Sequence, residues 1–119
     1  MTERSQIKDI IDDYIRAVNA NDLSDVPFSP GVVMTGPMIP VPIEGAQAVR
    51  EHLQNVAPFV KHFALLELVI EGEKAAGVFD YESINGIRFQ ACQFFRFENG
   101  AIAEDRVFYD TAILMRGRT

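Results

Sequence analysis

Two Asn-Gly pairs, at residues 85–86 and 99–100, constrain the fold of this chain more than any other feature. Each pair lies between segments in which apolar and polar residues alternate, and Asn-Gly in that setting is the strongest short-range signal of a β-hairpin. The pattern predicts three long antiparallel strands, over residues 75–83, 87–97 and 101–115. Strands of this length form a wide sheet that needs an apolar layer against one face.

The first half of the chain predicts two amphipathic helices that can supply this layer. Apolar residues recur at helical spacing over residues 2–20, with charged residues between them. The same spacing appears between Ala46 and Val56, and Pro58 ends that helix. Between the two helices, Asp22 can cap a short helical turn.

Three further segments complete the predicted fold. Residues 31–35, which include Met34, are a short strand candidate, and the proline-rich residues 36–43 are expected to form a lip over the mouth of the core. Alternation over residues 60–71 predicts another strand, with His62 on its inward face. The order of elements predicts an α+β fold in which a strongly bent antiparallel sheet wraps around the N-terminal helices.

The register of the two hairpins decides which side chains face inward, because a one-residue slip moves every side chain to the other face. If Asn-Gly alone forms each turn, Asp80 and Arg106 share the face of Gln93 and form a carboxylate and arginine site suited to hydrolysis of a compound such as an epoxide. Three-residue loops that end in a left-handed glycine instead place Asp105 opposite Gln93. We favour the second register because it buries far fewer charges.

In the favoured register the inward side chains predict an apolar pocket with a few polar groups. The predicted wall consists of Met34, Leu53, Phe79, Tyr81, Phe89 and Phe95. A buried amide at Gln93 must find a partner, and Asp105 among aromatic rings would have a raised pKa and could act as a general acid or base. His62, which titrates near neutrality, is a candidate proton shuttle. Each residue also has a simpler explanation without function. Gln93 would be a core amide with its hydrogen bonds satisfied, Asp105 a solvated carboxylate and His62 a partly exposed histidine.

Charge and composition exclude several classes of function. The net charge is −6 and the basic residues are scattered, which argues against a nucleic-acid surface. No run approaches the ~18 apolar residues that span a bilayer. The single Cys92 excludes an internal disulfide and a Cys-rich zinc site, and no metal-ligand spacing is present. Polar residues follow Met1, so we expect a cytoplasmic protein. The length predicts one domain over residues 1–119.

The outer face of the predicted sheet also carries apolar residues. They are Val78, Cys92, Phe94 and Phe108. A strip of this kind suits pairing of the sheet with a second copy of the chain, so we expect a homodimer.

Three segments carry a resemblance to a known family: residues 14–23 (YIRAVNANDL), 44–51 (EGAQAVRE) and 94–100 (FFRFENG). Together they span nearly the whole chain, and they resemble the nuclear transport factor 2-like superfamily, the cone-shaped α+β fold of ketosteroid isomerases and SnoaL-like polyketide cyclases. The resemblance is specific for fold, because this fold hosts unrelated chemistries as well as pure binding proteins.

The resemblance also implies site residues. In ketosteroid isomerases an aspartate base moves a proton while a tyrosine and a protonated aspartic acid stabilise the oxyanion. The tyrosine falls on Tyr14, the base on Gly36 and the aspartic acid on Gln93. Two of the three positions are changed, which disfavours steroid isomerisation, although Tyr14 and Gln93 can still donate hydrogen bonds to an oxygen. Asp105 resembles a position where some SnoaL-like cyclases carry an acid or base, whereas the simpler explanation of Tyr14 is a core tyrosine.

Three hypotheses follow. In the first, the apolar cavity binds a hydrophobic carbonyl or polycyclic compound and, if the protein is an enzyme, acts on it by isomerase- or cyclase-type acid-base chemistry without metal or other cofactor. In the second, favoured by the glycine at the base position, the protein is a non-catalytic carrier or sensor. In the third it is an interaction domain, and the cone is simply filled by Phe79, Phe89, Phe95 and Phe97.

Overall fold

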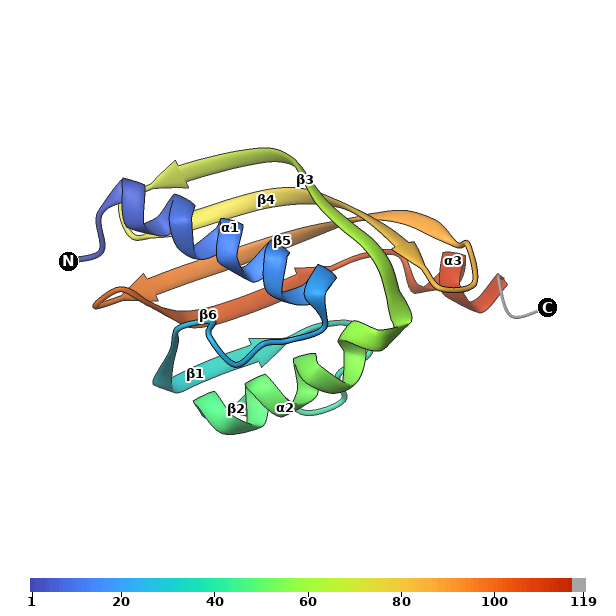
Figure 1. Cartoon of the computed structure of the whole chain (residues 1–119), viewed down its shortest axis with the longest axis horizontal. Helices are drawn as coiled ribbons and strands as arrows, with labels where there is room; N and C mark the ends of the chain where they lie inside the picture. Colours follow the sequence, from blue (N-terminus) through green and yellow to red (C-terminus); the bar gives the residue numbers. More distant parts are fainter. Residues whose placement is uncertain (117–119) are drawn as a thin grey trace.

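The computed structural model describes residues 1–116, which form helices packed against one curved sheet (Figure 1). The helical elements are α1 (Arg4–Ala20), α2 (Ala46–Val56), the short 3-10 helix η1 (Ala57–Phe59) and α3 (Thr111–Arg116). The strands are β1 (Phe28–Thr35), β2 (Ile43–Glu44), β3 (Val60–Glu71), β4 (Lys74–Ser83), β5 (Arg88–Glu98) and β6 (Ala101–Phe108). The predicted α+β class is confirmed.

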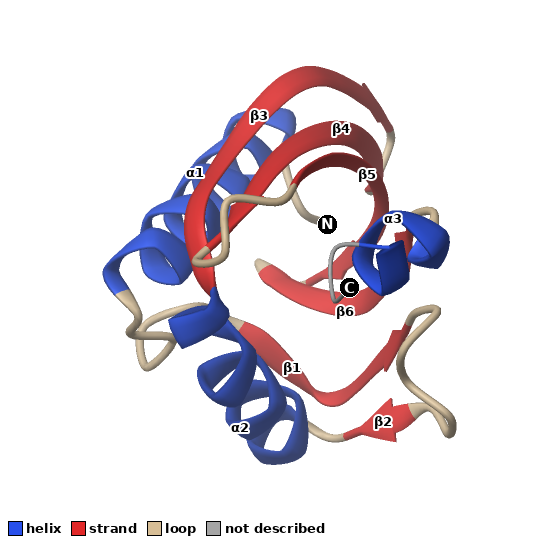
Figure 2. Cartoon of the chain, turned by 90° about the vertical axis from the view of Figure 1, so that its right-hand side faces the viewer, coloured by secondary structure: helices blue, strands red, loops and turns tan. Residues whose placement is uncertain are grey.

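The six strands lie in the order β2-β1-β6-β5-β4-β3. The pairs from β3 to β6 are antiparallel as predicted, but β1 runs parallel to β6, so the sheet is mixed. Figure 2 shows the sheet curling around a central space without closing into a barrel, with α1 and α2 beside it. The strong bend was predicted, and the parallel pair was not.

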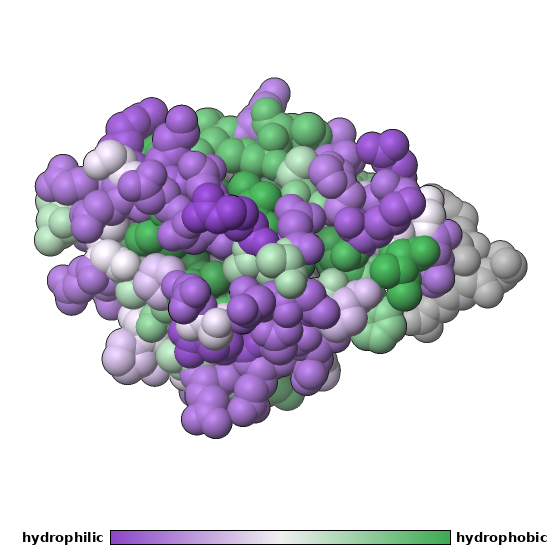
Figure 3. All heavy atoms as spheres, viewed as in Figure 1, coloured by the Kyte–Doolittle hydropathy of each residue, from purple (hydrophilic) through white to green (hydrophobic). Residues whose placement is uncertain are grey.

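Helix α1 covers one half of the concave face. Its buried side chains are Ile7, Ile10, Ile11, Tyr14 and Val18. Glu3 and Gln6 form a reciprocal capping box at its start, and Asn21 ends it in the left-handed conformation, with φ of 60°. The polar side of the helix faces solvent, and the corresponding surface is mostly hydrophilic with small apolar patches (Figure 3).

The segment after Asp22 forms a single hydrogen-bonded turn, with Asp22 bound to its backbone, and does not form a short helix. Asp22 accepts hydrogen bonds from Ser24 in a local turn, and residues 21–27 form no helix. The Leu23 carbonyl oxygen accepts the Val26 N–H at 3.3 Å, and the carbonyl oxygens of Leu23 and Val26 also accept hydrogen bonds from the Arg50 side chain of α2. Contacts with a distant helix therefore take up the backbone groups that a local helix would have used.

The last strand is shorter than predicted. It ends at Phe108, and α3 begins at Thr111, so the strand expected to continue to residue 115 is wrong. Asp110 lies between the two elements, and its Oδ1 accepts a hydrogen bond from the backbone N–H of Ala112 at 2.9 Å. An aspartate that binds a backbone N–H two residues on favours the start of a helix over a continued strand.

The two Asn-Gly loops differ from one another. The first is the predicted three-residue loop, in which Gly86 has φ of 84° and Glu82 pairs with Arg88. The second is a two-residue turn in which Asn99 and Gly100 both have positive φ, as a type I′ turn requires.

A bulge restores the inward orientation that the second turn would otherwise reverse. Phe97 pairs with Ile102, but Arg96 pairs with Glu104, so Ala103 is the extra residue on β6. Asp105 consequently faces inward, as predicted, but lies opposite Phe95 and not opposite Gln93. The register differs from the predicted one by two residues, and a two-residue shift leaves every side chain on the same face.

A second bulge corrects the prediction for β3. Leu65 pairs with Phe79 and Glu67 with Val78, which leaves Leu66 unpaired and reverses the alternation at that point. Phe63 is therefore buried, whereas His62 is exposed. The expectation that His62 faces the cavity is wrong.

The alternative site built from Asp80 and Arg106 is also wrong. Both lie on the outer face, where Asp80 pairs with Arg88 at 3.2 Å. Arg106 lies over the rings of Phe94 and Phe108, 5.6 and 5.3 Å from their centroids. The outer strip that motivates a homodimer thus carries a cation stacked on its aromatic residues, and the dimer stays a prediction. Within residues 1–116, no helix has the length and apolar character needed to cross a membrane.

Candidate functional site

A cavity of about 260 Å³ opens at one end of the concave face. It lies between α2, the lip at residues 36–39 and the ends of β4 and β5. Its wall is mainly apolar and includes Met34, Ile39, Leu53, Val56, Phe89 and Val107. Its polar residues are Tyr14, His52, Tyr81, Glu82, Ser83, Gln93 and Tyr109. Residues 36–39 of the predicted lip cover the cavity, but they form a turn rather than an extended segment, and Ile43 at the end of the lip joins the sheet, where it pairs with Met34.

Four of the six predicted wall residues line this cavity: Met34, Leu53, Tyr81 and Phe89. The other two, Phe79 and Phe95, are a correction. Both are fully buried in the packed core beneath α1, where Phe79 stacks on Phe63 with ring centroids 4.8 Å apart. The aromatic rings therefore fill one half of the cone and leave the other half open. This cavity contradicts the hypothesis of a cone filled completely by phenylalanines.

Three polar side chains meet at the inner end of the cavity, and we call them the polar triad: Tyr14, Gln93 and Asp105. The Tyr14 hydroxyl donates a hydrogen bond to Asp105 Oδ2 at 3.0 Å. Gln93 Nε2 donates to Asp105 Oδ1 at 3.2 Å and to the Tyr14 hydroxyl oxygen at 3.4 Å. Helix α1 and strands β5 and β6 each contribute one member.

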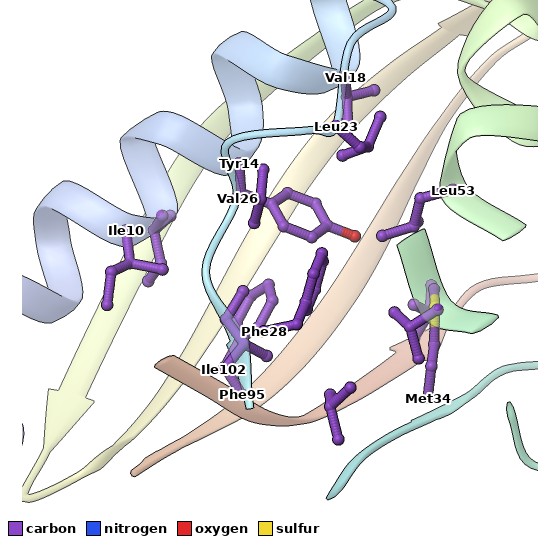
Figure 4. Close-up of a cluster of buried hydrophobic side chains, with 14 of the residues drawn as sticks. Ile10, Tyr14, Val18, Leu23, Val26, Phe28, Met34, Leu53, Phe95 and Ile102 are labelled. Atoms are coloured by element: carbon purple, nitrogen blue, oxygen red, sulfur yellow. The ribbon is translucent and has the colours of Figure 1, made fainter. Parts of the chain in front are cut away.

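The packing around the polar triad explains how the three side chains are held. Figure 4 shows the Tyr14 ring inside the apolar cluster, with its hydroxyl oxygen directed from α1 towards the side of Leu53. The Tyr14 ring packs edge-on against Phe95, with centroids 5.6 Å apart. Phe95 is also the residue that pairs with Asp105 across the sheet. The same phenylalanine thus packs against Tyr14 and is the cross-strand neighbour of Asp105.

Burial of the polar triad shifts its proton equilibria. The exposed fractions are 1% for Tyr14, 1% for Gln93 and 0% for Asp105. Burial raises the pKa of Asp105 from 3.8 to about 7, although the hydrogen bonds from Tyr14 and Gln93 oppose the shift. Burial, followed by the negative charge of Asp105, raises the pKa of Tyr14 well above 10. Asp105 therefore exchanges its proton near neutral pH, whereas the Tyr14 hydroxyl stays protonated.

Tyr14 and Gln93 line the cavity, but Asp105 lies behind them and is not part of the wall. An effect of Asp105 on a molecule in the cavity must pass through the hydroxyl of Tyr14 or the amide of Gln93. The sequence predicted correctly that all three side chains point to the inner face of the sheet. The order in depth was visible only in the structure.

One atom of the polar triad has no partner. Gln93 Oε1 is buried and accepts no hydrogen bond within the described part of the chain. A buried acceptor without a partner costs about 1–3 kcal/mol, so native structures seldom leave one without a reason. Because the Gln93 side chain belongs to the cavity wall, this acceptor is a feature of the candidate site.

His52 is the site residue that the sequence analysis missed. It lies on α2, lines the cavity and is half-buried, and burial lowers its pKa below 6.5. It is therefore a neutral imidazole at pH 7 and can accept a proton. Its position at the margin of the apolar stripe of α2 was the available signal. For β3, the adjacent pair Leu65-Leu66 was the signal of a bulge.

Gly36, where the resemblance places the isomerase base, also lines the cavity. It offers no side chain for proton transfer. A Cβ at this position would lie 3.5 Å from the side chains of Ile39 and Val107, which is ordinary contact. Across the residues that the structure describes, no three His, Cys, Asp or Glu side chains are grouped to hold a metal ion.

The fold is that of the nuclear transport factor 2-like proteins, which confirms the resemblance. A nuclear transport factor 2-like protein of unknown function from Mesorhizobium loti has a TM-score of 0.79 and 19% identity, covering 92% of this chain and 96% of its own. A protein from Jannaschia sp. CCS1, provisionally named a SnoaL-like polyketide cyclase, has a TM-score of 0.82 and 13% identity over 98% and 96% of the two chains. A provisionally named isomerase from Rhodopseudomonas palustris has a TM-score of 0.79 and 20% identity over 99% and 98%.

Among proteins with this fold, the chain belongs to one particular family. The family described as "Domain of unknown function (DUF4904)" matches residues 2–117. No curated protein matches the chain in sequence. At these levels of identity the solved structures establish the fold alone, and the function has to be argued from the site.

Proposed function

We propose that this protein binds a small, largely apolar molecule with a polar oxygen and acts on it by acid-base chemistry of the isomerase or cyclase type. The observation that carries the proposal is the polar triad at the inner end of an otherwise mainly apolar cavity of about 260 Å³. Apolar walls with a few convergent polar groups are typical of small-molecule sites. The names given to two of the structural relatives, a polyketide cyclase and an isomerase, agree with this class of chemistry.

The polar triad supplies a way to move a proton at the buried end of the ligand. When Asp105 is protonated it can donate to the Tyr14 oxygen, and Tyr14 can then give its own hydrogen to an oxygen atom of the ligand. Because the pKa of Asp105 is raised to about 7, both protonation states are populated at neutral pH. In this mechanism Asp105 is a positioning residue that acts through Tyr14, and Tyr14 is the catalytic residue that contacts the ligand.

The opposite step needs a proton acceptor on the cavity wall, and His52 fits that role. Its imidazole is neutral at pH 7 because burial lowers its pKa. The base position implied by the family resemblance is Gly36, which has no side chain, so a base must come from elsewhere. A proton taken from a carbon next to a carbonyl by His52, with one returned through Tyr14, would interconvert keto and enol forms of a bound ligand.

The two histidines provide a matched experiment. We expect His52→Gln to reduce turnover of an active ketone by about 100-fold or more, the usual contribution of a general base. His62→Gln, on the exposed face of β3, should leave turnover unchanged. Activity would first be located with a panel of bicyclic ketones and phenols, followed by proton exchange in deuterated water. Equal turnover in both variants would remove His52 from the mechanism.

A non-catalytic carrier or sensor is the second candidate. It is favoured by the missing side chain at Gly36 and by the position of Asp105 behind the cavity wall. A carrier would show a rise in melting temperature with panel compounds and no deuterium exchange into them. Tyr14→Phe would then weaken binding but have no turnover to change.

A further inference from the structure

The hydrogen atoms of the polar triad can be counted. With Asp105 ionised, the three side chains own three donor hydrogens: one on the Tyr14 hydroxyl and two on the Gln93 amide. Three hydrogen bonds connect the three side chains, at 3.0, 3.2 and 3.4 Å. Every donor hydrogen of these three side chains is therefore used inside the polar triad, and the triad has none left for a molecule in the cavity.

The polar triad also has one acceptor oxygen more than its own donor hydrogens reach. Gln93 Oε1 is the buried side-chain oxygen that accepts nothing within residues 1–116. The orientation of the amide follows from the charge of Asp105, because a reversed amide would place Oε1 against a carboxylate oxygen. The Asp105 carboxylate therefore accepts one N–H of the amide, the Tyr14 hydroxyl oxygen accepts the other, and Oε1 is turned away from the carboxylate.

We propose that the cavity selects ligands that offer a hydrogen-bond donor, such as a phenol, an enol or an alcohol, to Gln93 Oε1. The inference deepens the proposed function and rests on it, since it assumes that the cavity is a ligand site. It differs from an oxyanion site, in which the protein supplies the donors and the ligand supplies the acceptor. The ligand class is thus a hydroxylated, mainly apolar compound in preference to a simple ketone.

The surroundings favour a ligand over a trapped water as the missing partner. A buried water usually makes about three hydrogen bonds. Of the other wall residues, Met34, Leu53, Phe89 and Val107 offer no hydrogen bond, and Tyr81 is the further polar group that lies near Asp105. An apolar ligand with a single hydroxyl matches these walls better than a water molecule does.

Protonation of Asp105 adds one donor hydrogen to the polar triad. The polar triad then holds four donor hydrogens for the same internal bonds, and the surplus can reach the cavity through Tyr14. The groups that face Asp105 are Tyr14 of α1, Gln93 of β5 and Tyr81 of β4, while its neighbour on β1 is the apolar Met34. Burial, followed by the charge of Asp105, raises the pKa of Tyr81. The cavity therefore accepts a ligand hydrogen when Asp105 is ionised and gains a donor when it is neutral.

Three bicyclic probes of similar size test the inference: 2-naphthol, its methyl ether and 1-tetralone. Dissociation constants would be measured by calorimetry at pH 8.0 and pH 5.5. At pH 8.0 we expect naphthol to bind about tenfold more tightly than the ether or the ketone, the difference of one hydrogen bond. At pH 5.5 the preference for naphthol over the ketone should shrink to about threefold or less, because the site gains a donor.

Two glutamines on β5 provide the matched variants. Gln93→Leu should abolish the preference for naphthol at pH 8.0, and Gln90→Leu, an exposed residue of the same strand, should retain it. The pH series would be repeated in His52→Gln, because that histidine also gains charge at low pH. If Gln93→Leu does not fold, the wild-type comparison of naphthol with its ether still decides the question.

The contrary outcomes are separable. Equal affinity for the three probes at pH 8.0 in the wild type would overturn the inference and leave the proposed binding function standing. No binding of any probe at millimolar concentration would overturn the binding function and the inference with it.

Discussion

The two halves of the concave face differ, although the same strands build both. Under α1, the rings of Phe63, Phe79 and Phe95 pack against one another and are fully buried. Under α2 and the lip, Tyr81 and Phe89 stack with centroids 5.2 Å apart but border a cavity. Inward aromatic residues thus form a closed core or an open site, depending on which helix covers them.

The difference lies in the cover. Helix α1 presents a continuous apolar stripe and enters the sheet's curve, whereas α2 has two buried residues, Val49 and Leu53. The proline-rich lip turns back on itself and cannot fill the remaining volume, and two of its residues, Met38 and Val41, stay exposed. The polar triad lies at the boundary between the packed half and the open half.

Removing a ring from each half gives the largest expected contrast. Phe95→Ala should lower the free energy of unfolding by about 3–5 kcal/mol, because it leaves a void among packed rings. Phe89→Ala enlarges a cavity that already exists and removes a partly buried ring, so it should cost less than about half as much. Urea denaturation measures both values. Equal losses would mean that the two halves are packed alike.

The pH dependence of stability tests the burial of Asp105, which belongs to the polar triad between the packed half and the open half. Asp105 has a pKa of about 7 in the folded protein and 3.8 as its ordinary value, so between these values the folded chain holds a proton that the unfolded chain has lost. The contribution of Asp105 to stability should therefore be highest below pH 4, fall as pH rises to 7, and then level off, by about 4 kcal/mol in total.

The comparison with Asp105→Asn isolates this effect from other titrating groups. The difference in unfolding free energy between wild type and variant should change between pH 4 and pH 7 and stay flat on either side. Asp80→Asn, on the outer face, is the matched control and should show no such change. A wild-type stability that rises with pH in this window, relative to Asp105→Asn, would contradict the raised pKa.

Two glycines give the smallest contrast. A Cβ at Gly77, in the packed half, would lie 2.8 Å from Phe79 Cε2 and 3.1 Å from Leu65 Cδ1. Gly77→Ala should therefore cost about 1–3 kcal/mol through overpacking. Gly36→Ala has only ordinary contacts in the open half and should change stability by less than about 0.5 kcal/mol. Thermal unfolding would show which variant loses more stability. A larger loss for Gly36→Ala than for Gly77→Ala would contradict a packed half around Gly77 and an open half around Gly36.

Much of the fold was predictable because its signals are local. The Asn-Gly pairs located two hairpins, and helical spacing located α1 and α2 to within a few residues. The predicted end of β6 and the short helix expected after Asp22 were wrong, because distant or capping side chains bind backbone groups there. Contacts of that kind leave no periodic trace in a sequence.

The candidate site was predictable in part. Tyr14, Gln93 and Asp105 were placed on the inner face correctly, since exclusion of charged side chains from the core decides which alternate residues of each strand point inward. The inward orientation of Asp105 was right, although the bulge at Ala103 produces it and the loop does not. His62 was placed inward incorrectly because one unpaired residue, Leu66, reverses the alternation of β3, and His52 on α2 was missed.

The sequence by itself determined the class of fold, the two covering helices and which residues of the last strands avoid water, because burial of apolar side chains follows the period of each element. Only the tertiary structure decided which buried residues border a cavity, that Asp105 lies behind Tyr14 and Gln93, and that one amide oxygen is left without a partner. Depth and unfilled volume depend on how helices, lip and bulges meet in space. No single segment of the chain carries that information.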